Sequence, residues 1–169
     1  MSRKTLHILG VIFVLILGTL LHFTYKWSGG NNFVALFSAT DESTFEHLKL
    51  LFWPFLIFTV IEYFVYGKEY GRFICIRLLS VLFGMAIIIV TFYTYTGVLG
   101  FNLLPLDIIT FLLGVIGAFY LSYKLLHGAY SLRDPRQIFC TFIWIVMIAC
   151  FIVWTFHPLN IGLFISPKV

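Results

Sequence analysis

The sequence predicts an all-α integral membrane protein, with residues 1–169 forming one domain built as a bundle of five transmembrane helices. Three observations predict this. Hydrophobic residues make up 61% of the chain, charged residues make up only 11%, and the apolar residues gather in five long runs. A soluble domain carries roughly 25% charged residues. We therefore expect lipid, and not water, to surround most of this chain.

The five apolar runs cover residues 6–25, 48–66, 73–95, 106–125 and 138–156. Each is close to the roughly 20 residues that a transmembrane helix needs. All must be helical, because lipid offers no partner to unpaired backbone N–H and C=O groups. The first run has a basic start, as a signal peptide does, but it is longer than a typical signal sequence and no small-residue cleavage site follows it. We interpret it as an uncleaved first span.

Basic residues predict the orientation. Eight of the 11 Lys and Arg residues fall on the side of the N-terminus, namely Arg3, Lys4, Lys68, Arg72, Arg77, Lys124, Arg133 and Arg136, and the other side holds Lys26, Lys49 and Lys168. Positive residues favour the cytoplasmic side, so we expect the N-terminus in the cytoplasm and the C-terminus outside. The basic residues form no continuous stripe, so nucleic-acid binding is not predicted.

Residues 27–47 form a long outer segment between the first two spans. A structureless loop of this length is uncommon unless it is functional or disordered. Its middle, residues 33–37, is apolar. We expect it to turn back into the membrane interface.

A ridge of small residues recurs every four positions in the fourth span, at Thr110, Gly114, Ala118 and Ser122. Small side chains let two helix backbones approach closely in a membrane. Gly114 and Ala118 therefore predict a close helix-packing partner, which the sequence places either in this chain or in another copy or subunit.

Polar residues concentrate at positions 41–49. If this stretch is helical, Glu42, Glu46 and Lys49 share one face, and His22 ends the first span at a similar depth. His157, Asn31 and Asp107 are expected on the same side. The predicted binding vestibule comprises His22, Trp27, Asn32, Glu42, Ser43, Glu46, His47 and Lys49.

Two interpretations of this stretch remain open. In the first, His22, Glu46 and His47 bind zinc or a related divalent ion, which would activate water in a metal-dependent intramembrane hydrolase. In the second, Ser43 and Glu46 form a capping box at a helix start, and the acidic side chains favour the positive end of the helix dipole. The sequence contains no HExxH motif that would decide for the metal.

Two charged residues lie inside spans, Glu62 in the second and Arg77 in the third. The spans are antiparallel, so the two side chains reach a similar depth and we expect an intramembrane ion pair. Charges inside a membrane are functional candidates by default, and Glu62 would then carry protons. The alternative is a structural pair with Arg77 extending toward the interface.

The three cysteines, Cys75, Cys140 and Cys150, lie within apolar runs and form no CxxC pair. Their spacing does not predict a zinc site or a disulfide framework. We expect them to act as small apolar residues in helices.

The segment Trp27-Ser28-Gly29, followed by Glu42-Ser43 and then Glu46-His47-x-Lys49, resembles an uncharacterised family of small bacterial multi-pass membrane proteins, a domain of unknown function. The likeness covers most of the chain. It implies a bacterial inner-membrane location and no particular activity.

The sequence contains no Walker-type loop and no nucleotide-binding GxGxxG after a strand. The leading functional prediction is a non-enzymatic binding or transport-associated membrane protein with a polar vestibule on the outer side. The alternatives are the metal-dependent hydrolase, and an accessory subunit whose small-residue ridges dock a partner.

Overall fold

A computed structural model describes residues 2–127 and 134–166. The described chain is all-α, as predicted, and it has six α-helices and two short 3-10 helices. In order these are α1 (Arg3–Trp27), α2 (Asn32–Ala35), α3 (Thr44–Val65), η1 (Gly67–Glu69), α4 (Phe73–Leu99), α5 (Leu104–Leu126), α6 (Arg136–Phe156) and η2 (Gly162–Phe164). Arg133 and Lys168, which contribute to the predicted charge asymmetry, lie outside the described residues.

Five of these helices, α1, α3, α4, α5 and α6, are long and apolar enough to cross a membrane. Each corresponds to one of the predicted spans, and the ends differ by a few residues. The start of α3 differs by four residues, at Thr44 and not at residue 48, because Ser43 caps a helix whose first turn is polar. The sixth helix, α2, is a single turn within the predicted outer segment.

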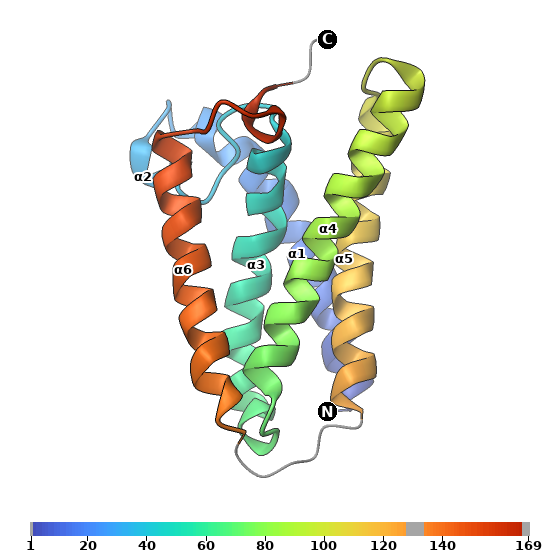
Figure 1. The fold of residues 1–169 in the computed structure, drawn as a ribbon, viewed down its shortest axis with the longest axis vertical. Coiled ribbons are helices and arrows are strands. Elements are labelled where there is room, and N and C mark those ends of the chain that lie inside the picture. Colours follow the sequence, from blue (N-terminus) through green and yellow to red (C-terminus); the bar gives the residue numbers. More distant parts are fainter. Residues whose placement is uncertain (1, 128–133, 167–169) are drawn as a thin grey trace.

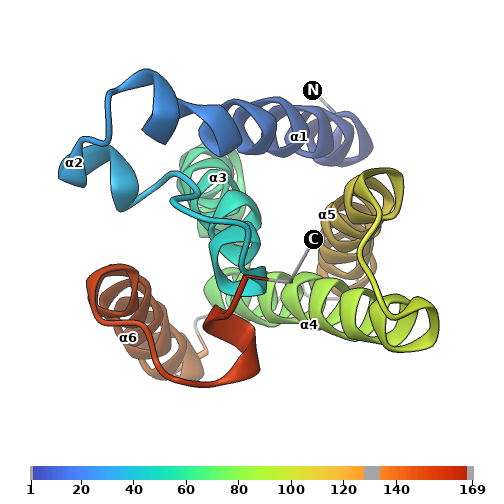
Figure 2. The same ribbon diagram turned by 90° about the horizontal axis from the view of Figure 1, so that it is seen from above.

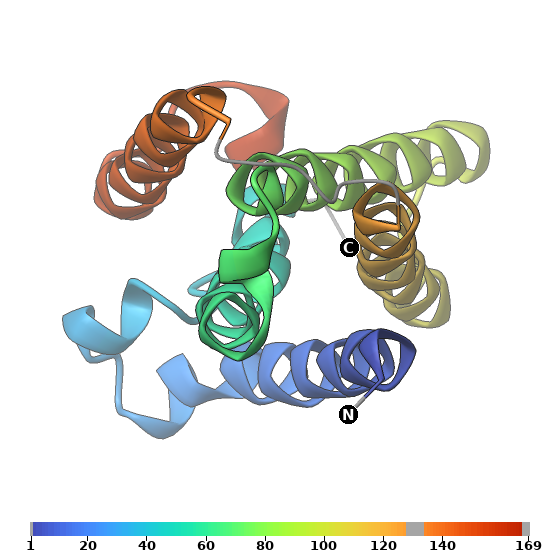
Figure 3. The same cartoon turned by 90° about the horizontal axis from the view of Figure 1, so that it is seen from below.

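The helices run up and down, with α3 in the middle of the bundle (Figures 1 and 2). Helix α3 contacts both α1 and α4, and α5 packs mainly on α4 and also contacts α1. The view from below shows α1, α4 and α6 starting at the same end of the bundle (Figure 3). We call this the Arg3 end, and we call the opposite end, where α1 finishes and α3 begins, the Trp27 end.

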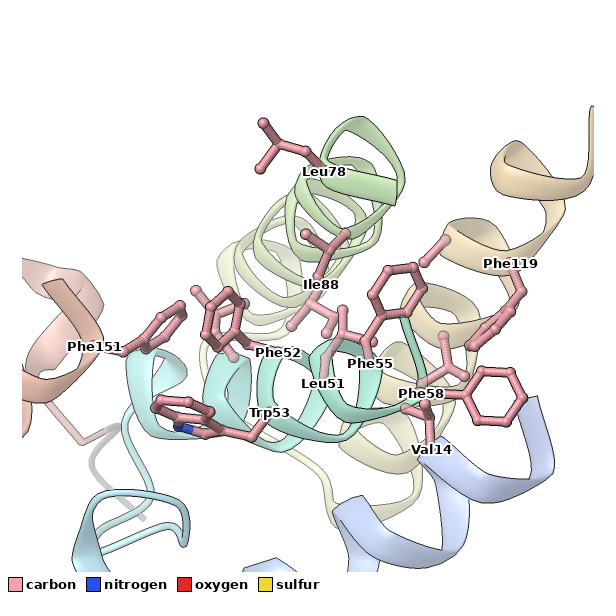
Figure 4. Close-up of a cluster of buried hydrophobic side chains, with 14 of the residues drawn as sticks. Val14, Leu51, Phe52, Trp53, Phe55, Phe58, Leu78, Ile88, Phe119 and Phe151 are labelled. Carbon is pink, nitrogen blue, oxygen red and sulfur yellow. The ribbon is translucent and has the colours of Figure 1, made fainter. Parts of the chain in front are cut away.

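The core is built largely from aromatic rings that α3 directs to all sides (Figure 4). Phe52 stacks on Phe151 of α6, and Phe55 packs against Phe119 of α5. The outward faces of the other helices remain apolar, and large side chains such as Phe142 are 60% exposed. Such a surface, apolar across the whole bundle, is suited to lipid and not to water.

Pro54 interrupts the hydrogen bonding of α3 at its centre. A proline has no N–H, so the carbonyl of Leu50 lacks its usual helical donor. Gly18 of α1 lies directly against this carbonyl, and a Cβ atom at Gly18 would stand only 2.6 Å from the Leu50 oxygen. The glycine therefore allows α1 to pack on the exposed carbonyl of α3.

The small-residue ridge of α5 faces α4 of the same chain. A Cβ atom at Gly84 of α4 would lie 2.7 Å from the carbonyl oxygen of Gly114 and 2.8 Å from the Cβ of Ala118. Ala118 is fully buried. The close packing partner of Gly114 and Ala118 is therefore α4 of the same chain.

Cys75 and Cys140 form a disulfide that joins the beginnings of α4 and α6, so the prediction that they are simply small apolar residues is wrong. The two residues are 65 positions apart, but their Cα atoms lie 5.2 Å apart because both helices start at the Arg3 end. Spacing along the chain gives no information about such a pairing. Cys150 is a free thiol in α6, as expected.

Asp134 fixes the start of α6 beside the start of α4. Its carboxylate accepts hydrogen bonds from Arg136 Nε and from Arg72 Nε, both at 2.9 Å. The hydrogen bonds from Arg136, and then that from Arg72, stabilise the carboxylate and lower the pKa of Asp134 to about 2. Together with the disulfide, this contact ties α6 to the rest of the bundle at the Arg3 end.

Candidate functional site

The segment after α2 is attached to α1 at the turn that carries His22. The Tyr25 N–H donates to Ser38 Oγ at 2.9 Å, while the Leu21 carbonyl accepts from the Ser38 hydroxyl and, at 3.3 Å, from the Ala39 N–H. Ser38 is fully buried there. This attachment brings the start of α3 to the side of α1.

The start of α3 is then set by an N-cap. Ser43 Oγ accepts from the Glu46 N–H at 3.4 Å, and Asp41 Oδ1 accepts from the Ser43 N–H at 2.7 Å. The first half of the predicted capping box is present. In the second half Asp41 replaces Glu46, whose carboxylate points elsewhere.

Glu46 instead forms a buried ion pair with Lys49, with Glu46 Oε2 and Lys49 Nζ 2.7 Å apart. Lys49 Nζ also donates to the Ala35 carbonyl at 2.8 Å and to Thr155 Oγ1 at 3.2 Å, and Glu46 accepts from the Thr40 N–H at 2.7 Å. The pair therefore holds the outer segment and α6 onto α3. Because of these contacts, the Glu46 carboxylate points toward Lys49 and the Thr40 N–H, and not toward His22.

Glu42, which precedes the helix, lies between the two histidines. Its Oε2 is 3.9 Å from His22 Nε2 and 3.7 Å from His47 Nε2. One ligand atom from each of the three residues lies within 4.8 Å of the others. In a tetrahedral site with bonds of about 2.0–2.1 Å, neighbouring ligand atoms stand about 3.3 Å apart. Small rotations of the Glu42 side chain, which is 54% exposed, and of the two histidine rings would bring the ligand atoms to that spacing.

The orientation of His47 suits a metal ligand. Its Nδ1 lies 2.9 Å from the Ser43 carbonyl oxygen, which can only accept, so Nδ1 carries the proton and donates. The lone pair is then on Nε2, which faces Glu42. Metal-binding histidines usually donate their other N–H in this way to a carbonyl or carboxylate. We call His22, Glu42 and His47 the His22–His47 triad.

Glu42 and His47 of the triad line a pocket of about 40 Å³ between α3, α4 and α5, which is room for a few water molecules. The Thr110 hydroxyl lines this pocket, is 3% exposed, and has no hydrogen-bond partner among the described residues. The pocket is lined by Glu42, Thr44, His47, Ile88, Phe92, Asn102, Asp107, Thr110 and Phe111. A bound polar ligand would satisfy the Thr110 hydroxyl.

Asp107 is the second carboxylate of the pocket. It accepts hydrogen bonds from the Tyr95 hydroxyl and from Asn102 Nδ2, and these hold it in place. No Lys or Arg belongs to the pocket lining. Together with Glu42, Asp107 makes the pocket electronegative and suited to a cation and its water ligands.

Two predicted vestibule residues, Trp27 and Asn32, lie apart from the triad, and so does His157, which was expected on the same side. Trp27 ends α1 with its side chain 69% exposed, and it stacks on Phe23. Asn32 begins α2 and is exposed, and His157 is the exposed residue that follows α6. None of the three lines the pocket.

Glu62 and Arg77 meet at the other end of the bundle, with Glu62 Oε2 and Arg77 Nη1 2.9 Å apart and both side chains fully buried. Sequence reasoning missed two residues that join them, His7 of α1 and Ser122 of α5. His7 lies within the first predicted span. An ionisable residue inside a span was the signal that could have identified it.

Comparison with known proteins assigns the chain to a family. The profile of a family of unknown function, DUF6512, matches residues 1–168. No curated protein and no solved structure matches the chain. The match covers nearly the whole length of a chain with five helices able to cross a membrane. The chain therefore belongs to the family of unknown function DUF6512.

Proposed function

We propose that this membrane protein binds a divalent transition-metal ion at the Trp27 end, through His22, Glu42 and His47. The carrying observation is the convergence of two histidines and one carboxylate within 4.8 Å, beside a pocket. Two imidazoles and a carboxylate suit zinc, and with open positions they also suit iron(II). Glu42 takes the place that the sequence suggested for Glu46. With this metal site, the protein would act in metal binding or in metal transport.

The charge asymmetry supports an orientation with the Arg3 end in the cytoplasm. In this arrangement the triad and its pocket lie on the outer side of the membrane. The resemblance of the Trp27-Ser28-Gly29 segment to small bacterial membrane proteins supports an inner-membrane location. The metal would then be captured from outside the cytoplasm.

A metal-dependent hydrolase is the second candidate, and the open side of the triad favours it. Three protein ligands leave at least one coordination position free, as catalytic zinc sites do. That position would face the pocket that holds Asp107 and the unpartnered Thr110 hydroxyl. A metal-bound water there would be activated for attack.

Elemental analysis of the purified protein tests the metal site. We expect close to one equivalent of metal per chain in the native protein, and a fall in affinity of at least about tenfold in Glu42→Gln and His47→Gln. Glu69→Gln is the matched control, because Glu69 is an exposed carboxylate in η1 at the Arg3 end. Its metal content should equal that of the native protein.

A folding readout accompanies the metal analysis. Metal at 100 times its dissociation constant should stabilise the native protein by about 2.7 kcal/mol, and a chelator should remove this increment. The metal proposal is rejected if the folded native protein stays metal-free under saturating zinc, or if Glu42→Gln and His47→Gln both keep full metal. Metal binding without hydrolysis of any ester or amide probe would leave the binding role and exclude the hydrolase.

A further inference from the structure

A second polar cluster lies inside the bundle near the Arg3 end, and the proposed metal site does not use it. Four helices contribute to it: α1, α3, α4 and α5. We call it the Glu62 cluster, and it consists of His7, Thr59, Glu62, Tyr66, Arg77 and Ser122. Glu62, Arg77 and Ser122 are fully buried, and His7 is 5% exposed. Ionisable groups in such a place are costly and are usually kept for a function.

The charged pair is held from both sides. Arg77 Nε donates to Thr59 Oγ1 at 2.9 Å, and the Tyr66 hydroxyl donates to Glu62 Oε1 at 3.0 Å. The guanidinium lies over the ring of Phe55, 3.9 Å from its centre. Even so, Arg77 Nη2 and Glu62 Oε2 have no hydrogen-bond partner among the described residues, although Oε2 contacts Arg77 Nη1 as an ion pair. The network is therefore not fully satisfied.

The hydrogen bonds of His7 fix its protonation pattern. Nδ1 lies 2.9 Å from the Arg3 carbonyl oxygen, which can only accept, so Nδ1 carries a proton. In the neutral ring Nε2 then has the lone pair and accepts from the Ser122 hydroxyl at 3.3 Å. Ser122 Oγ in turn accepts from Arg77 Nη1 at 3.1 Å. A directed chain of donors thus runs from Arg77 through Ser122 to His7 and ends at the first residue of α1.

His7 also has a counter-charge within reach. Its Nδ1 lies 3.9 Å from Glu62 Oε1. An imidazolium at this position would face the carboxylate, and an opposite charge at this distance stabilises the charged form. Other charged or titratable groups that face His7 among the described residues include Arg3 of α1, Arg77 of α4 through Ser122, and Tyr123 of α5, whose ring meets His7 edge-on.

We propose that the Glu62 cluster is a proton-binding site at the Arg3 end, with His7 as the group that takes up the proton. A proton from water at this end adds to His7 Nε2, and the Ser122 hydroxyl rotates so that it accepts from both His7 and Arg77. The cluster changes from net zero to net positive by one charge, with Glu62 facing the new imidazolium. Release returns the proton to water by the reverse step.

Nitrogen NMR of the native protein, labelled with ¹⁵N-histidine in detergent micelles, tests this. The His7→Gln variant identifies the His7 signals. We expect the neutral ring with the proton on Nδ1 at about pH 8, and a doubly protonated ring on acidification toward about pH 5, the range in which histidine switches. A His7 ring that stays neutral throughout, or that carries its single proton on Nε2, overturns the proposal.

Glu62→Gln then tests the counter-charge. The population of doubly protonated His7 at the acidic end should fall by about tenfold or more, since one opposite charge at this distance is removed. His157→Gln is the matched control, because His157 is an exposed histidine at the other end of the bundle. If Glu62→Gln does not fold, the titration of His7 in the native protein decides alone. Unchanged titration of His7 in folded Glu62→Gln would reduce the cluster to a structural ion pair.

Discussion

Replacing Lys49 by Met should destabilise the protein strongly, because it leaves Glu46 as an unpaired charge. Both side chains are buried, and their charged atoms lie 2.7 Å apart. Removing one partner of a buried ion pair costs about 3–5 kcal/mol. Lys49 also donates to the Ala35 carbonyl and to Thr155. We therefore expect the Lys49→Met cost in the upper part of that range.

The double variant Glu46→Gln/Lys49→Met separates the stranded charge from the lost hydrogen bonds. Without the carboxylate, no charge remains unpaired in the interior, and we expect recovery of roughly half of the loss, about 2 kcal/mol. Lys68→Met is the matched control. Lys68 is an exposed lysine in η1, and a surface substitution there should stay within about 0.5 kcal/mol of the native protein.

Equilibrium unfolding in mixed micelles, with a rising fraction of denaturing detergent and circular dichroism as the signal, measures all four proteins. If Lys49→Met unfolds at the native midpoint, the buried ion pair does not hold the outer segment, and the reasoning fails. If the double variant is no more stable than Lys49→Met, the loss comes from the contacts to Ala35 and Thr155 and not from the unpaired Glu46.

Three further outcomes follow from the packing. Gly18→Ala should cost about 1–3 kcal/mol in the same assay by overpacking. Gly97→Ala should cost nothing, because a Cβ atom added there would have no packing neighbour within 4 Å. Equal costs would contradict the close approach. Mass spectrometry of unreduced peptides should find Cys75 linked to Cys140, and free thiols at both in oxidised protein would disprove the disulfide. Because the pKa of Asp134 is lowered to about 2, its stabilising contribution should be full at neutral pH and should disappear as the pH falls from about 4 toward 2. Thermal melting of Asp134→Asn should therefore differ from that of the native protein only above this window, and a constant difference would exclude the ion pairs as its cause.

The five long apolar helices could be predicted because a long apolar run is a signal along one dimension. Lipid requires the same feature of every spanning segment, whatever its neighbours. The helix ends were less predictable, since they depend on local capping. Helix α3 starts at Thr44 because Ser43 accepts from the Glu46 N–H. A hydropathy pattern does not contain that hydrogen bond.

The candidate site could be predicted in its residue types but not in its geometry. The sequence suggested a helix that carries Glu42, Glu46 and Lys49 on one face. In the structure Glu42 precedes the helix, so it is free to lie between His22 and His47, while Glu46 turns toward Lys49. A difference of two residues at a helix start thus decides which carboxylate faces the histidines.

The pairing of α1 with α3 could not be derived from periodicity at all. Fifteen residues separate His7 from His22 on α1, and fifteen separate His47 from Glu62 on α3. Because the two helices are antiparallel, each histidine of α1 meets a partner near one end of α3, and the two meeting points lie about 22 Å apart along the helix axis. Apolar residues lie on every side of α3, which is typical of a helix buried on all sides. Its sequence therefore does not indicate which face meets α1. Once that single pairing is known, it places both the His22–His47 triad and the Glu62 cluster.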